Sequence, residues 1–155
     1  MTKELLRLLK LEIAALETAA ESLAYSHRKC VKTGIKKDYT QAELESFEAF
    51  TSRFARVSDI LIQKVFRLID KIELEDEGTV RDRINRAEKK GLIPSAGIFA
   101  EMRILRNDIP HEYQSENLKA IYKKTLEFSP HLTAAIAKVK DYCKRFAVQV
   151  SDRLL

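Results

Sequence analysis

The sequence predicts an all-α protein, an up-down bundle of about three long helices with shorter helices between the second and the last. First, the 155 residues include only 4 Gly and 3 Pro, so the chain has few places for sharp turns. Second, apolar residues recur at steps of three and four, the period of one helix face. Third, 45% of the residues are hydrophobic, which suits one packed domain over residues 1–155.

Two apolar stripes predict the first two long helices. The first helix is expected from Thr2 to about Lys29, and residues 32–38 read as a loop. Thr40 and Glu43 form a capping box that opens the second helix, which runs to about Ile72. A short loop between two such helices predicts antiparallel packing. The stripes comprise Leu5, Leu9, Ile13, Leu16, Ala20 and Leu23 in the first helix, and Leu44, Phe47, Phe50, Phe54, Val57, Leu61, Val65 and Leu68 in the second.

Shorter helices are predicted in the second half of the chain. After an acidic connection, Thr79 begins a short basic helix that Gly91 ends, and Pro94-Ser95 begins the next one. Ser115 is expected to cap a helix over residues 116–127. Ser129-Pro130 then predicts the start of the last helix, because proline is favoured at a first helical position. Its apolar stripe is Leu132, Ile136, Val139, Cys143, Phe146 and Val150.

The charge is compatible with a polyanionic partner but does not require one. The formal net charge is +5 and the pI is about 9.2, values that many solvated helical surfaces also give. The short basic helix is either an RNA-backbone contact or a solvated face partly balanced by Asp82 and Glu88. The RNA-binding candidates are Arg81, Arg83, Arg86, Lys89, Lys90 and Arg103.

Other patterns narrow the class of protein. Cys30 and Cys143 follow no paired spacing, which favours a reducing compartment. The first residues carry charges at helical intervals and predict no signal peptide, and no apolar run suits a membrane span. We therefore expect a cytoplasmic protein. Neither a zinc-ligand spacing nor a glycine-rich phosphate loop occurs in the sequence, so we expect no metal and no cofactor.

Residues 106–113, RNDIPHEY, carry the candidate chemistry. The guanidinium of Arg106 matches phosphate oxygens, and the imidazole of His111 suits proton transfer near neutral pH. On an unbroken helix the two side chains would diverge by about 140°. Pro110 cannot donate to the carbonyl of Arg106, so we expect this turn to be opened, or the helix to end there. Without a catalytic role, Arg106 would pair with a carboxylate such as Glu112, and His111 and Tyr113 would be ordinary surface or core-edge residues.

This stretch resembles the signature of the HEPN superfamily, an arginine followed four to six residues later by a histidine. Asn107 after the arginine fits that signature, and Tyr113 extends the match to the form found in HepT-like toxins. The order of the preceding helices is similar too, from residues 47–50 through 63–65 to 90–93. The resemblance covers most of the chain, and Pro110 departs from the expected pattern.

The resemblance implies a HEPN-like helical bundle that acts as a homodimeric, metal-independent endoribonuclease toxin. His111 would be the acid and base, Arg106 would bind the scissile phosphate, and Asn107 would orient the phosphate or the histidine. Tyr113 would be the residue that a cognate minimal nucleotidyltransferase antitoxin modifies with AMP. The alternative is a non-catalytic helical substrate-binding or scaffold subunit of a nucleotidyltransferase, and a helical interaction module without nucleic acid is a third possibility.

Overall fold

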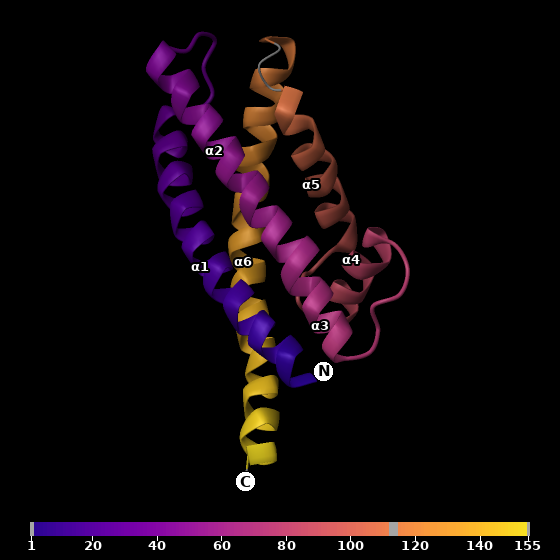
Figure 1. The fold of residues 1–155 in the computed structure, drawn as a ribbon. Coiled ribbons are helices and arrows are strands. Elements are labelled where there is room, and N and C mark those ends of the chain that lie inside the picture. The colour runs from indigo at the N-terminus through magenta and orange to yellow at the C-terminus, as the bar shows by residue number, and fades with distance from the viewer. Residues whose placement is uncertain (1, 112–114, 155) are drawn as a thin grey trace.

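The computed structural model describes the backbone of residues 2–111 and 115–154 and the side chains of residues 2–111 and 117–146. The helices run alternately up and down along one another (Figure 1), and none of the described residues forms a strand. The predicted all-α class is confirmed. In chain order the elements are α1 (Thr2–Thr33), α2 (Gln41–Asp59), the π-helix η1 (Ile60–Val65), α3 (Phe66–Ile72), α4 (Val80–Lys89), α5 (Ala96–Asp108), the 3-10 helix η2 (Ile109–His111) and α6 (Ser115–Leu154).

The α1–α2 hairpin forms as its capping signals predict. The Thr40 hydroxyl accepts a hydrogen bond from the Glu43 N–H at 3.1 Å, and the Glu43 carboxylate accepts one from the Thr40 N–H at 2.9 Å. Tyr122 of α6 locks this hairpin to the bundle. Its ring stacks on Phe47 at 3.7 Å between centroids, and its hydroxyl donates to the Cys30 carbonyl at 2.8 Å. Such aromatic pairs add about 0.5–1.5 kcal/mol beyond the burial of their area.

The second long helix continues from Gln41 to Ile72, but six residues in its middle are π-helical. The Phe66 N–H donates to the Leu61 carbonyl, five residues back. Four residues at four-residue steps are fully buried here: Val57, Leu61, Val65 and Ile69. On an α-helix each four-residue step overshoots one full turn by about 40°. The wider π turn reduces that overshoot, so the stripe keeps facing the core.

The predicted break before Pro130 is wrong, because α6 runs as one helix from Ser115 to Leu154 with Pro130 inside it. Proline here removes the hydrogen bond to the carbonyl of Leu126. Packing maintains the helix across this point, since Thr125, Ser129 and Leu132 are all buried. Ser129 does not cap a helix start. Its hydroxyl donates to the carbonyl of Thr125, four residues back, at 2.7 Å.

Candidate functional site

The Arg106–His111 segment lies at the C-terminal end of α5. The Ser95 hydroxyl accepts from the Ile98 N–H at 3.2 Å and caps the start of this helix, as predicted. Leu105 and Ile109 are buried in the core and fix the rotation of the helix. The α-helix ends at Asp108, and a 3-10 turn carries the next three residues. This agrees with the expectation that Pro110 interrupts the helix.

Arg106 is held by a carboxylate from the second long helix. Its Nε and Nη2 atoms donate to Oδ1 and Oδ2 of Asp59 at 2.7 and 2.8 Å. The Arg106 side chain is 31% exposed and that of Asp59 is 42% exposed. The hydrogen bonds that Arg106 donates to Asp59 raise the pKa of Arg106 further above its usual range. The guanidinium is therefore oriented and charged, and Asp59 is its partner among the described residues. Glu112, the partner considered from the sequence, lies outside the described residues.

A groove opens on one side of this ion pair, with a volume of about 810 Å³. Asp59, Arg106 and residues of α2, η1 and η2 line it, and its wall mixes charged, hydroxyl and apolar groups. The remaining lining residues are Glu48, Ser52, Ala55, Arg56, Ile60, Lys64, Ile109 and Pro110. This groove has the size of a ligand site rather than of a packing defect.

A smaller hollow of about 300 Å³ opens beside the same ion pair. Asp59 and Arg106 line both spaces, so the ion pair forms the partition between them. The smaller hollow is polar, and its other lining residues are Ser58, Ile62, Gln63, Arg103 and Asn107. The π-helix contributes Ile60 and Lys64 to the groove and Ile62 and Gln63 to the hollow. π turns inside α-helices frequently occur at functional sites.

The structure brings together some of the predicted catalytic residues and separates others. Asn107 is exposed and lines the smaller hollow with Arg106. His111 is exposed on η2 and is not among the residues that line either space. The 3-10 turn advances about 120° per residue, which does not close the angle between Arg106 and His111. Tyr113 lies outside the described residues.

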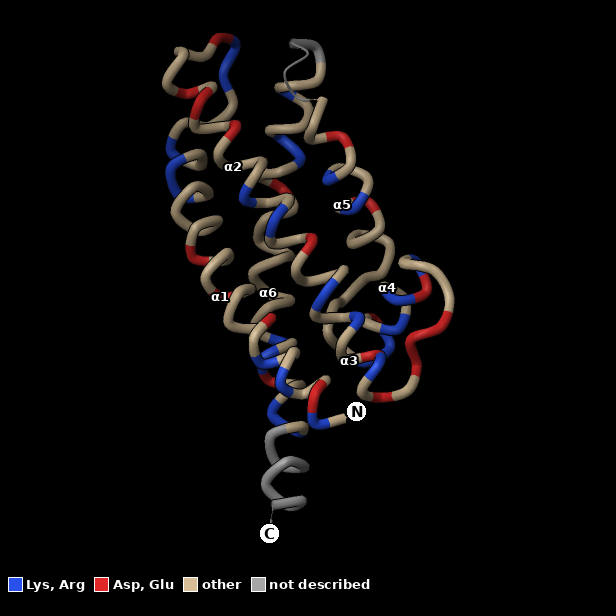
Figure 2. Tube along the Cα trace, in the orientation of Figure 1, with Lys and Arg blue, Asp and Glu red and all other residues tan. Residues whose placement is uncertain are grey.

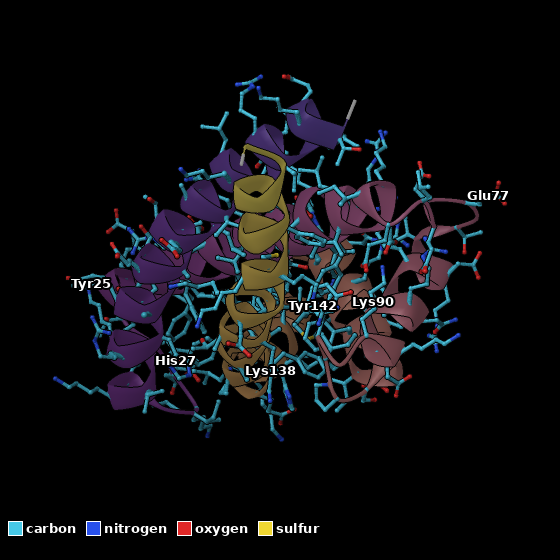
Figure 3. All side chains as sticks on the ribbon, turned by 90° about the horizontal axis from the view of Figure 1, so that it is seen from below. Tyr25, His27, Glu77, Lys90, Lys138 and Tyr142 are labelled. Atoms are coloured by element: carbon cyan, nitrogen blue, oxygen red, sulfur yellow. The ribbon has the colours of Figure 1, made fainter. Side chains whose placement is uncertain are left out.

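Two of the basic residues in and after α4 have an ion-pairing role that the sequence did not predict. The Arg86 Nε and Lys90 Nζ atoms lie 2.9 and 2.6 Å from the carboxylate of Asp70, whose side chain is only 4% exposed. Lys90 also lies 3.1 Å from Glu73, and the Tyr142 hydroxyl donates to Glu73 at 2.7 Å. Acidic and basic positions lie close together where α3 meets α4 (Figure 2). Figure 3 shows Lys90 and Tyr142 beside one another between α4 and α6.

These contacts also change the electrostatics of the cluster. Burial by itself would lower the pKa of Lys90, but hydrogen bonds to Asp70 and Glu73 outweigh burial and raise it. Lys90 is thus a fixed cation that ties α4 to the end of α3. Contact of Arg86 and Lys90 with RNA stays a prediction. An RNA phosphate would have to compete with Asp70 for these two cations.

Arg83 connects the basic helix to the smaller hollow. Its Nη1 atom donates to the Gln63 side-chain oxygen at 3.0 Å and to the Ile62 carbonyl at 3.3 Å. Burial lowers the pKa of Arg83; the negative charge of Asp70 opposes this shift, and the positive charges of Arg67, Arg86 and Arg103 add to it. Arg103 therefore lies close enough to Arg83 for the two charges to repel each other. Arg81 and Lys89, the other candidates on α4, are exposed, and Arg81 donates to the Asn85 side chain at 3.2 Å.

Sequence reasoning missed Asp59 and Gln63. Asp59 stands 47 residues before Arg106, and no local spacing connects the two. The signal that was available is weak: a single acid on a helix face between the buried Val57 and Leu61. Sequence alone gives no reason to pair that acid with one particular arginine among many.

Comparison of the chain with models of known protein families finds no match, and comparison with curated proteins finds none either. Among the described helices, none combines the length and the apolar character needed to cross a membrane. Within the same part of the chain, no three His, Cys, Asp or Glu side chains are grouped so that they could hold a metal ion.

Proposed function

We propose that this chain is a metal-independent endoribonuclease of the HEPN type, the toxin of a HEPN/minimal-nucleotidyltransferase pair. The observation that carries the proposal is the position of Arg106. Its charged guanidinium is oriented by Asp59 and is partly exposed between a large groove and a polar hollow. A polymer with a phosphate at every unit can lie across such a partition, and guanidinium groups bind phosphate well.

The proposed reaction needs only proton transfer and charge stabilisation. RNA carries its own nucleophile, the ribose 2′-hydroxyl. His111 accepts the proton of this hydroxyl while its oxygen bonds to the adjacent phosphorus. The bond from phosphorus to the 5′ oxygen breaks, and that oxygen takes the proton back from the imidazolium. The products are a 2′,3′-cyclic phosphate and a 5′-hydroxyl. Arg106 stabilises the charge that builds on the phosphate oxygens, and the proton transfers contribute about 10²–10⁴ in rate.

The geometry of one copy supports a homodimer as the acting unit. His111 is exposed and stands outside the groove that Arg106 lines. The helix turn directs the two side chains apart. A second copy, related by a two-fold axis through this surface, would bring its own His111 to the phosphate held by Arg106. We therefore propose a composite site in which each phosphodiester meets Arg106 of one copy and His111 of the other.

The proposed antitoxin acts on Tyr113, two residues after His111. This part of the proposal rests on the HepT-like resemblance of the motif. A bound AMP would add negative charge and bulk beside His111, and both would oppose an approaching RNA backbone. The cognate minimal nucleotidyltransferase would therefore switch off the nuclease without unfolding it.

Replacing the proposed proton carrier tests the function directly. His111→Ala should reduce cleavage of a fluorescent single-stranded RNA by at least about 10² in the presence of EDTA, because the proton-transfer contribution is lost. The products of the parent protein should carry 2′,3′-cyclic phosphate and 5′-hydroxyl ends. His131→Ala, on the half-buried face of α6, is the matched control and should cleave at the parental rate. Equal cleavage by the His111→Ala and parent proteins would refute the proposed mechanism.

A second candidate function is favoured by one specific observation. Both oxygens of Asp59 already occupy the Nε and Nη2 donors of Arg106, and His111 does not line the groove. This arrangement also suits a non-catalytic helical subunit that binds substrate or acts as a scaffold for a nucleotidyltransferase. Such a subunit would co-purify with the enzyme encoded next to it and would leave RNA intact in EDTA at any protein concentration.

A further inference from the structure

We infer that the smaller hollow is a second phosphate subsite, in which Arg103 binds the phosphodiester next to the one held by Arg106. The inference rests on the proposed function, because it concerns the RNA that would lie across the Arg106–Asp59 partition. It adds a specific claim, namely that the preferred substrate presents two consecutive phosphodiesters, and that Arg103 recognises one of them.

The chemistry of the hollow favours an anion. Arg103 and Arg106 place two guanidinium groups on its wall, and Asp59 is the one carboxylate among the described residues that line it, so these residues carry a net positive charge. Asp59 is already bound to Arg106. Among the described side chains, no carboxylate lies within ion-pair distance of Arg103, which is half-buried. A half-buried guanidinium without a counterion has strong affinity for a phosphate oxygen.

A neutral donor is held in place beside Arg103. The side-chain oxygen of Gln63 accepts a hydrogen bond from Arg83 at 3.0 Å, which leaves the Gln63 amide N–H groups as the part of this side chain able to contact a ligand. Asn107 lines the same hollow and offers a second amide. The site thus combines the guanidinium of Arg103 with neutral amide N–H donors, the combination that binds phosphate oxygens in proteins.

The dimensions fit neighbouring phosphates of one strand. Arg103 and Arg106 stand three residues apart on α5, and side chains at this spacing have Cβ atoms about 5–6 Å apart. The two guanidinium groups can therefore reach successive phosphates without a rearrangement of the helix. The hollow, at about 300 Å³, exceeds the roughly 30 Å³ of a single water about tenfold. It can hold a phosphate group together with part of its ribose.

Binding of two short ligands distinguishes this subsite from the scissile position. The protein is the full chain carrying His111→Ala, which does not cleave under the proposed mechanism. The ligands are a dinucleoside monophosphate with one phosphodiester and a trinucleoside diphosphate with two. Arg103→Gln should weaken trinucleoside binding on the order of tenfold, the loss expected for one charge-assisted hydrogen-bonded contact. Binding of the dinucleoside should stay within about twofold, because its single phosphate sits at Arg106.

The matched control is Arg28→Gln, an exposed arginine of α1 that lines neither the groove nor the hollow. It removes the same charge and should leave both affinities within about twofold of the parent. Against a longer single-stranded RNA, Arg103→Gln should also reduce the slope of log affinity against log salt by about 0.7, the value for one phosphate contact. Arg103→Lys should restore part of the loss, because it returns the charge without the planar fork.

The outcomes separate failure of the subsite from failure of the nuclease. Equal trinucleoside affinities in Arg103→Gln and Arg28→Gln would overturn the subsite, and so would an equal loss for both ligands in Arg103→Gln. Either result leaves cleavage by the parent standing. A parent protein that neither binds nor cleaves RNA would overturn both proposals. Should Arg103→Gln fail to fold by circular dichroism, Gln63→Glu provides a second test, since its carboxylate would lie in the hollow with Arg103 and should weaken trinucleoside binding more than dinucleoside binding.

Discussion

At the scale of single residues, Asp59 determines what Arg106 is able to do. The carboxylate fixes the guanidinium in one orientation, which favours rapid and accurate binding of a phosphate. It also occupies two donors that a phosphate would use. In the proposed nuclease Asp59 would therefore be both a positioning residue and a competitor of the substrate, and the two roles would make opposite contributions to affinity and to turnover.

Asp59→Asn should reveal this competition. In the His111→Ala background the substitution should tighten RNA binding about three- to tenfold, because one repelling charge is removed and the Arg106 fork is released. In the otherwise unchanged protein it should lower both KM and kcat, since the guanidinium is then less well oriented. Fluorescence anisotropy and initial-rate measurements supply these numbers.

Asp38→Asn, in the exposed loop between α1 and α2, removes the same charge and should change neither quantity. Because the Asp59 side chain is 42% exposed, loss of the ion pair should change the free energy of unfolding by no more than about 1 kcal/mol. Weaker RNA binding by Asp59→Asn than by the parent would contradict the competition argued for this carboxylate.

At the scale of elements, α4 is attached through charge more than through apolar area. Only two of its residues, Ile84 and Ala87, are buried, whereas Arg86 and Lys90 converge on Asp70. This explains why a helix whose sequence reads as a basic surface is nonetheless fixed in the fold. It also means that a charge-reversal scan of α4 would confuse loss of folding with loss of RNA binding.

Asp70→Ala should destabilise the protein by about 3 kcal/mol, because it leaves Arg86 partly buried without its carboxylate and leaves Lys90 with only the more exposed Glu73 and Glu75. Urea denaturation followed by circular dichroism measures the free energy of unfolding. Glu88→Gln, on the exposed side of α4, should stay within about 0.5 kcal/mol of the parent. A loss no larger than that of the control would show that α4 is attached in some other way.

Local signals predicted helices well and connections between helices less well. The capping residues Thr40, Thr79 and Ser95 each lie one residue before a helix, as predicted, because a cap depends on atoms only three residues away. The break expected at Pro130 did not occur, because burial of neighbouring residues by distant helices outweighs the local cost of a proline. Four-residue steps at Val57, Leu61 and Val65 were present in the sequence and hinted at the π turn.

At the scale of the whole molecule, the all-α class could be predicted and the assembly of the site could not. The stripes establish which faces pack, but the pairing of Arg106 with Asp59 depends on how α5 rotates against the second long helix. Rotation is decided by the shapes of buried residues such as Leu105 and Ile109, which periodicity does not encode. The same limit applies to the proposed homodimer, because the sequence pattern does not mark the surface on which a second copy would pack.

A mixing experiment tests the proposed composite site. Arg106→Ala and His111→Ala proteins should each be inactive alone. Mixed in equal amounts under conditions that exchange subunits, they should regain about a quarter of the parental RNase activity, since half of the dimers are then mixed and each has one intact site. Sedimentation equilibrium establishes the dimer independently. Inactivity of the exchanged mixture would place both groups in the same copy, or would show that no shared site exists.

The π-helix at Ile60–Val65 has a consequence for how the sequence of this protein can change. A π turn contains one residue more than an α-helix needs to complete the same rotation around its axis. Deletion of one of these six residues would therefore let the segment relax to α geometry with little rotation of α2 relative to α3. Asp59 and the phenylalanines of α2 would then keep their partners. The same deletion inside the α-helical part of α2 would rotate everything before it by about 100°, so a change of length is better tolerated in the π-helix than beside it.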